Sequence, residues 1–154
     1  PMVVLFGRPK RIDASGIVLS SGADGQGAVN FLYEGMNATV LYSKIADSSL
    51  PTEIQGEAGN LTLDRINIIS HVSFTPRLAA SSGKGPKAEP EELSRHYEKD
   101  EYYYEVAEFI NLVLSGQRES QINSHENSLI TLEIIDEVRR QLGIVYPADT
   151  QKTL

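Results

Sequence analysis

The chain has 154 residues, the size of one ordinary domain. Its 14 Lys and Arg residues against 21 Asp and Glu residues give a formal net charge of −7, which argues against a partner that presents a phosphate backbone, so no nucleic acid is expected. It contains no cysteine, which excludes disulfides and Cys-ligated zinc, and no stretch approaches the roughly 18 apolar residues that a membrane span needs.

Alternating apolar and polar residues dominate the first half and predict strands joined by tight turns. The longest of them carries Ile66, Ile68, Val72 and Phe74 on one face, and its other face is mixed, with Ile69, His71 and Ser73. The predicted strands cover residues 10–20, 28–34, 38–47, 52–57, 61–64 and 66–76.

The second half changes to a helical period after a segment, residues 79–92, whose Ser, Gly, Pro and charged residues predict a mobile loop. Apolar residues at helical spacing predict a helix over 103–114, which Gly116 ends. A second helix is expected to start at Asn123 as N-cap, with Glu126 completing a capping box, and to stop at Gly143. Arg139 and Arg140 lie in its last turn, where they complement the helix dipole.

Strands followed by helices predict one α+β domain over residues 1–154: an open, mostly antiparallel sheet of about six strands with helices packed on one face. The mixed face of such a sheet needs a partner. The residues that we assign to this contact are Ile69, His71 and Ser73.

No cofactor loop, metal site or catalytic group stands out. Gly22, Gly25 and Gly27 have the order G-x-x-G-x-G with a strand after them, whereas a dinucleotide fingerprint needs G-x-G-x-x-G opening a helix. The three histidines are not paired at helical spacing, and no G-x-S-x-G elbow is present. We therefore assign no catalytic, cofactor-binding or metal-binding residue in this chain.

Several short segments, in order and with fitting spacing, resemble one known family. They are Phe6-Gly7 with Pro9, Tyr42-Ser43-Lys44, Pro51 with the run from Glu53 to Glu57 and Gly59, Tyr104-Glu105 with Phe109-Ile110, and Asp136 with Arg139 followed by Gly143 to Pro147. This pattern resembles the C-terminal domain of the Gfo/Idh/MocA oxidoreductases. The resemblance implies a sheet face that packs against a second subunit, so we expect a homodimer through the sheet face. It also implies a separate Rossmann domain that binds NAD or NADP.

The family's catalytic lysine segment and its cofactor fingerprint have no counterpart here, and its active-site helix would lie upstream of Met2. Residue 1 is proline and an apolar run follows it at once, so we expect the numbering to describe a fragment that binds no cofactor. Hydride transfer needs both a bound cofactor and a proton donor or acceptor near the substrate oxygen.

The resulting hypothesis is a substrate and oligomerisation domain of a cytoplasmic oxidoreductase that acts on a sugar, polyol or diol. Lys44, Arg77 and Tyr103 are the candidate substrate-facing residues, although each also fits a solvated surface position. The alternative is a free-standing, non-enzymatic binding or dimerisation module of the same fold.

Overall fold

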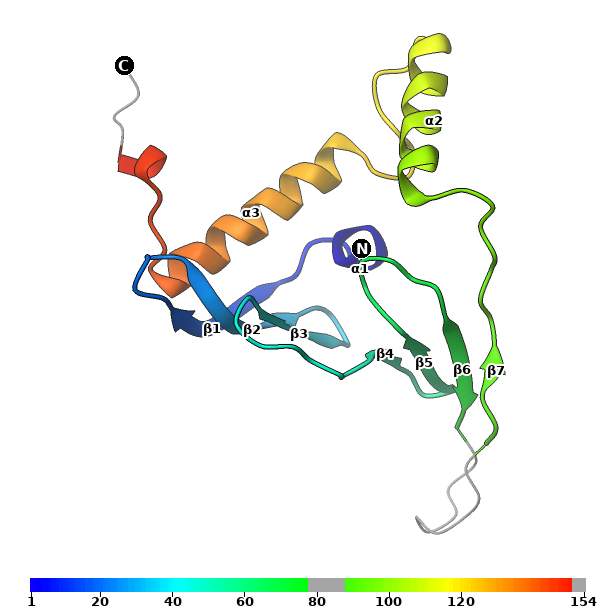
Figure 1. Cartoon of the computed structure of the whole chain (residues 1–154), viewed down its shortest axis with the longest axis horizontal. Coiled ribbons are helices and arrows are strands. Elements are labelled where there is room, and N and C mark those ends of the chain that lie inside the picture. Colours follow the sequence, from blue (N-terminus) through cyan, green and yellow to red (C-terminus); the bar gives the residue numbers. More distant parts are fainter. Residues whose placement is uncertain (78–87, 151–154) are drawn as a thin grey trace. The chain divides into compact units, whose positions relative to one another are not determined.

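The computed structural model describes residues 1–77 and 88–150. Its helices are α1 (Met2–Phe6), α2 (Glu101–Leu114), α3 (His125–Leu142) and the short 3₁₀ helix η1 (Pro147–Thr150) (Figure 1). Its strands are β1 (Arg11–Val18), β2 (Asp24–Leu32), β3 (Asn37–Ser43), β4 (Thr52–Gln55), β5 (Gly59–Leu63), β6 (Val72–Pro76) and β7 (Glu91–Glu92).

All pairings between these strands are antiparallel, which confirms the α+β class and the open, antiparallel architecture expected from the sequence. The sequence predicted one sheet of about six strands, whereas the strands form two hydrogen-bonded sheets, one with the order β1-β2-β3 and one with the order β4-β5-β6-β7. Strand periodicity reports which residues share a face, but it does not report where one sheet ends and another begins.

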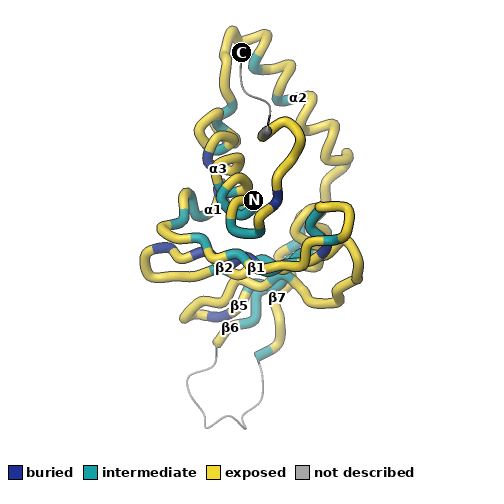
Figure 2. Tube along the Cα trace, turned by 90° about the vertical axis from the view of Figure 1, so that its left-hand side faces the viewer, coloured by how far each residue is buried: buried dark blue, intermediate teal, exposed yellow. Residues whose placement is uncertain are grey.

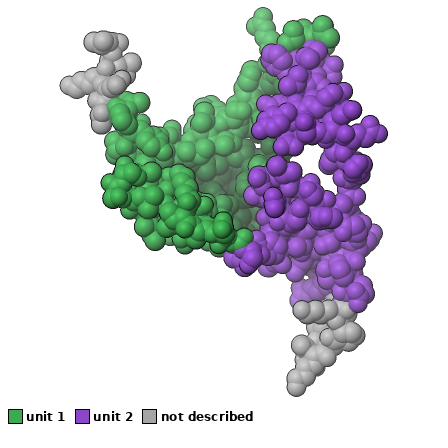
Figure 3. All heavy atoms as spheres, in the orientation of Figure 1, with its two compact units in different colours: residues 1–48, 112–154 green, residues 49–111 purple. Residues whose placement is uncertain are grey.

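The chain divides into two compact units (Figure 3). The first unit consists of residues 1–48 and 112–154, and the second of residues 49–111. Each unit holds one of the two sheets, so each is described separately.

The core of the first unit lies between α3 and one face of the β1-β2-β3 sheet (Figures 1 and 2). Alternation along β2 puts Val29 and Phe31 on the same face, and both are buried together with Tyr33. From α3, Ile134 and Val138 pack against this cluster, four residues apart and therefore on the same side of the helix. The helix covers one face of the sheet, as the sequence predicted for this part.

Gln141 joins α3 to the edge of the sheet. Its side-chain amide donates to the Ile12 carbonyl over 2.7 Å and its amide oxygen accepts from the Ala14 N–H over 2.6 Å. Among the described residues β1 pairs only with β2, so these backbone groups belong to an edge beside which that part of the chain places no other strand. Gln141 thus substitutes for a neighbouring strand and covers an edge that would otherwise expose unpaired groups.

Both long helices end as the glycine positions predicted, but α3 starts one residue later than expected. Gly116 and Gly143 each adopt a φ of 69°, the left-handed conformation that a helix C-terminus favours. The expected N-cap Asn123 is wrong: Ser124 is the N-cap, and its hydroxyl accepts from the Asn127 N–H over 3.1 Å. Asn and Ser cap almost equally well, so adjacent candidates are not distinguished by residue type.

The predicted strand over residues 66–76 is wrong in its first half, since β6 covers only Val72–Pro76. The Asp64 carboxylate accepts the N–H groups of Ser70 and His71 over 3.0 and 3.1 Å, which folds the intervening residues into a loop. A side chain that satisfies backbone donors competes directly with strand pairing. Ile69 and His71 therefore lie outside the strand to which the sequence assigned them, and Ser73 alone stays in it.

The segment expected to be a mobile loop, residues 79–92, is described only in part. Residues 79–87 lie outside the described residues, whereas Glu91–Glu92 form β7, which pairs with β6 through Ser73 and Phe74. A two-residue strand has no periodicity to detect, because alternation needs at least four residues to be seen.

Replacing Gln141 with Met should destabilise the first unit by about 1–3 kcal/mol, because it removes both hydrogen bonds to the β1 edge while keeping the side-chain length. Urea unfolding of Gln141→Met measures this, with Arg140→Met, an exposed neighbour on α3, as the control. Equal midpoints for the two variants would show that the edge contact contributes nothing.

Candidate functional site

The first unit contains a hollow of about 340 Å³ beside its core. Its walls come from β2, β3, α3 and the segment that follows α3. Most of the lining is apolar: Val29, Phe31, Ile134, Ile135, Val138, Leu142 and Ile144. A few polar residues complete it: Asp24, Tyr42, Lys44, Arg139 and Tyr146. An apolar hollow with a few convergent polar groups is the usual form of a small-molecule site.

Lys44, one of the residues predicted to face a substrate, lines this hollow and pairs with Asp24. The Lys44 ammonium lies 2.5 Å from the Asp24 carboxylate, and the Lys44 N–H donates to the Gly25 carbonyl. The register of the β2–β3 hairpin brings these residues together, since Gln26 lies opposite Ser43. The Asp24 side chain is only 19% exposed, so the carboxylate is held largely inside the hollow.

The ion pair shifts both pKa values toward the charged forms. The hydrogen bond from Lys44 lowers the pKa of Asp24 below its ordinary value of 3.8, although partial burial opposes this. The hydrogen bond to Asp24 raises the pKa of Lys44 above 10.5. The pair is therefore ionised across the neutral range and offers both donors and acceptors to a ligand.

Tyr42 lies across the hairpin from Gly27, and its position depends on that glycine. A Cβ at Gly27 would lie 2.7 Å from the Tyr42 ring, so the ring occupies the space that any other residue would fill. Burial, and then the Asp24 carboxylate, raise the pKa of the Tyr42 hydroxyl. This hydroxyl stays protonated at neutral pH and can donate a hydrogen bond.

Arg139 connects the hollow to the chain after α3, a role that the sequence did not reveal. It bonds to Asp136 over 2.9 Å and to Asp149, and its guanidinium carbon lies 4.2 Å from the centre of the Tyr146 ring. In the sequence, its position in the last turn of a helix is already explained by a favourable interaction with the helix dipole. The contacts with Asp149 and Tyr146 involve no helical spacing, so no pattern in the sequence indicates them.

Arg77, the second predicted residue, lines a hollow of about 390 Å³ in the second unit. This hollow lies at the ends of β4, β5 and β6, and its other lining residues are Gln55, Gly56, Gly59, Asn60, Thr75 and Pro76. The Arg77 N–H donates to the Ala58 carbonyl over 2.8 Å, which anchors the residue just after β6.

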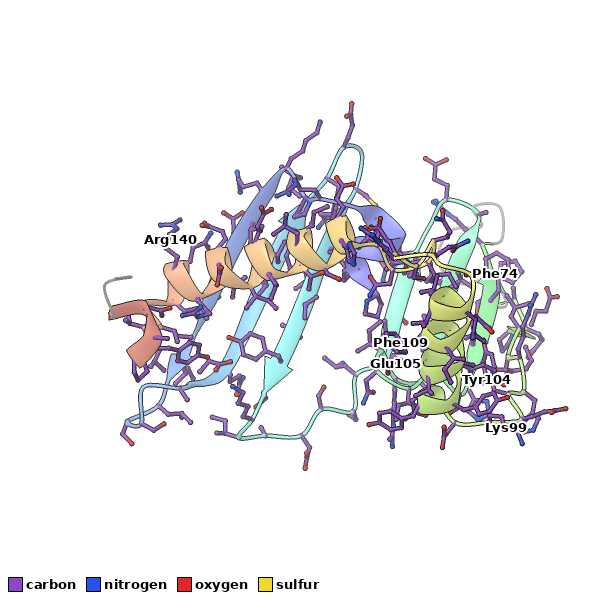
Figure 4. The ribbon with its side chains drawn as sticks, turned by 90° about the horizontal axis from the view of Figure 1, so that it is seen from above. Phe74, Lys99, Tyr104, Glu105, Phe109 and Arg140 are labelled. Carbon is purple, nitrogen blue, oxygen red and sulfur yellow. The ribbon has the colours of Figure 1, made fainter. Side chains whose placement is uncertain are left out.

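Tyr103, the third predicted residue, lines neither hollow described above. It belongs to an aromatic group on and before α2, in which the Tyr104 ring contacts both the Tyr103 ring and the Tyr97 ring edge-on at 5.5 and 5.7 Å. Lys99 lies 6.0 Å from the centre of the Tyr103 ring; Figure 4 labels Lys99 and Tyr104. Within the second unit, Arg77 and Tyr103 therefore do not line a common hollow, and Lys44 belongs to the first unit.

The residues described contain no group of three His, Asp or Glu side chains arranged to hold a metal ion. Among the same residues, no helix has the length and apolar character needed to cross a membrane.

No protein-family model matches the chain. It aligns over 149 residues, 97% of its length, with the scyllo-inositol 2-dehydrogenase (NADP(+)) IolU of Bacillus subtilis (strain 168) at 41% identity. It is 34% identical over 153 residues to the uncharacterized oxidoreductase YgjR of Escherichia coli (strain K12), and 30% identical over 148 residues to the trans-1,2-dihydrobenzene-1,2-diol dehydrogenase of Danio rerio. These alignments confirm the resemblance to oxidoreductases.

The chain spans less than half the length of these relatives. The aligned part is 43% of the Bacillus protein and 42% of each of the other two.

The Asp24–Lys44 pair should make the free energy of unfolding depend on pH in the acidic range. Because the pKa of Asp24 is lower in the folded state than in the unfolded state, its contribution is fully present above about pH 4 and is lost as the pH falls through the lowered pKa. Urea midpoints at pH 6 and pH 3 should therefore differ less in Asp24→Asn than in the unchanged protein. An identical difference in both proteins would count against the pair.

Proposed function

We infer that this chain is the substrate and dimerisation domain of an NAD(P)-dependent dehydrogenase. It is homologous to part of three oxidoreductases, which is what we expect of the C-terminal domain of a Gfo/Idh/MocA enzyme. The observation that carries this proposal is the alignment of 97% of the chain with 43% of the Bacillus dehydrogenase at 41% identity. The remaining length of such an enzyme supplies the dinucleotide-binding domain.

The proposed reaction transfers a hydride between the nicotinamide and a hydroxyl-bearing carbon of a sugar, polyol or diol. The names of two relatives, an inositol dehydrogenase and a dihydrodiol dehydrogenase, support this class of substrate. The cofactor supplies the hydride chemistry, and the protein binds and orients the substrate against it. This chain contributes a wall of the substrate pocket, whereas the catalytic groups come from the rest of the enzyme.

Lys44 is the strongest candidate for contact with a hydroxylated substrate. Its ammonium lies with the Asp24 carboxylate and the Tyr42 hydroxyl around one hollow, so donors and acceptors are both at hand. Arg77 is a candidate in the second unit, because it lines a hollow there. Tyr103 remains a candidate on sequence grounds alone.

A homodimer through a sheet face is the proposed assembly. We place the contact on the β1-β2-β3 sheet, because Ile69 and His71, which the sequence assigned to it together with Ser73, lie outside β6. The face of the β1-β2-β3 sheet opposite the core carries the exposed apolar residues Ile17, Leu32 and Leu41. Small, polar and charged residues lie between them: the Thr39 hydroxyl bonds to Asn30 over 2.8 Å, and Arg11 pairs with Asp13 over 2.7 Å. A face of this composition suits a second copy of itself, since two-fold contacts are the commonest in oligomers. The cytoplasmic location expected from the sequence stays a prediction.

The chain alone should bind no NAD(H) or NADP(H), whereas the whole polypeptide that carries it should bind one of them and reduce it in the presence of a polyol or diol. Calorimetry on both proteins measures binding, and absorbance at the reduced nicotinamide band measures activity with inositol and with cyclic diols. Micromolar cofactor affinity of the chain alone would contradict the proposal that another domain binds the cofactor. A whole polypeptide without a dinucleotide-binding domain would contradict the proposal that the protein is a dehydrogenase.

Replacing Leu41 with Lys should weaken self-association by at least about tenfold in dissociation constant, because it puts a charge into the proposed apolar contact. Leu41 is 62% exposed in the single chain, so the fold itself should tolerate the change. Leu114→Lys is the control, because Leu114 is 80% exposed at the end of α2 and lies on no sheet. Sedimentation equilibrium distinguishes the two variants, and equal dissociation constants would exclude this face.

A further inference from the structure

The segment that follows α3 forms one wall of the hollow in the first unit. Gly143 turns the chain out of the helix in a left-handed conformation, and Ile144 then packs inside, 6% exposed. Ile144 and Tyr146 both line the hollow. We call residues 144–149 the strap.

One side chain of α3 connects this strap to the body of the unit. Arg139 bonds to the Asp149 carboxylate and stacks on the Tyr146 ring at 4.2 Å. Within the strap, the same Asp149 carboxylate accepts the Tyr146 N–H over 2.8 Å, and the Asp149 N–H donates to the Tyr146 carbonyl over 2.9 Å. The guanidinium thus contacts both residues that give the strap its local shape.

We propose that Arg139 is a positioning residue that latches the strap against the hollow and holds Tyr146 beside the Asp24–Lys44 pair, so that release of the latch opens the hollow. The proposal concerns the access to this site and does not depend on the reaction that takes place there.

The surroundings of Arg139 distinguish this latch from an ordinary surface ion pair. Exposed pairs contribute little because water screens them and both side chains lose freedom. The Arg139 side chain is only 21% exposed and combines two carboxylates with an aromatic ring, which a planar guanidinium can contact at once. The Tyr146 ring that the guanidinium contacts lines the same hollow as Lys44, so the latch acts directly at the wall of the site.

The neighbouring Arg140 provides a matched control. It also lies in the last turn of α3 and also pairs with a carboxylate three residues earlier, since it bonds to Glu137 over 2.6 Å. Its side chain is 70% exposed, and in Figure 4 it projects outward from α3. Loss of Arg140 therefore removes a helix-dipole interaction and an ion pair with the residue three positions earlier, as loss of Arg139 does, but it leaves the strap attached.

Hydrogen exchange of single backbone amides tests the latch in the whole polypeptide that carries this chain. In Arg139→Gln, the Tyr146 and Asp149 amides should exchange at least roughly tenfold faster, because the strap detaches more often. The Ile144 amide is an internal reference: it bonds to the Arg139 carbonyl over 3.0 Å, a backbone contact that the substitution keeps. Arg140→Gln should leave all three rates unchanged.

A second readout reports on the site itself. The rate at which Lys44 is acetylated by a soluble reagent should rise roughly twofold in Arg139→Gln and not in Arg140→Gln, because the strap no longer holds Tyr146 beside the ammonium. A role of Arg139 confined to the helix end would not change this rate.

Arg139→Lys should fail to restore the latch, since an ammonium lacks the planar fork and the stacking surface of a guanidinium. If Arg139→Gln does not fold, Asp149→Asn releases the latch from the strap side and should produce the same increase at Lys44. Equal amide exchange in Arg139→Gln and Arg140→Gln, or unchanged Lys44 acetylation in both Arg139→Gln and Asp149→Asn, would overturn the proposal.

Discussion

The packing of α3 on the β1-β2-β3 sheet is the contact on which the rest of the first unit depends. Ile134 and Val138 cover the buried side of β2, and Gln141 holds the free edge of β1. The same helix then supplies one wall of the hollow and, through Arg139, the attachment of the strap. Each of these features requires α3 to lie at a fixed rotation about its axis, because helix residues that are three or four apart share a face.

The charged groups that line this hollow are all ion-paired, which bears on what they can bind. The Lys44 ammonium faces the Asp24 carboxylate, and Arg139 is bonded to two carboxylates. A site with matched charges offers little net attraction to an anion, but it presents both donors and acceptors to hydroxyl groups. This balance agrees with the neutral hydroxylated substrates that we propose.

Local sequence patterns predicted helices and strands well where no side chain competed with the regular backbone hydrogen bonds. Alternation located β1 and β3, and the left-handed glycines located the ends of α2 and α3. Alternation placed β2 too late, because β2 begins at Asp24 and includes Gly25 and Gly27, which the sequence assigned to a turn before the strand. Prediction failed at residues 66–71, where the Asp64 carboxylate binds backbone N–H groups and displaces strand pairing. It also failed to distinguish Ser124 from Asn123 as N-cap, since the two residue types offer the same hydrogen bond.

The sequence by itself determined which residues alternate, which glycines end helices and which oxidoreductases the chain resembles, because each of these properties depends on neighbours within about one turn of helix or on residue identity. The tertiary structure alone decided that Lys44 meets Asp24, that Tyr42 lies over Gly27, and that Arg139 holds the strap. Those contacts depend on hairpin register and on the course of the chain after Gly143, and a shift of one residue in register would turn each strand side chain to the opposite face.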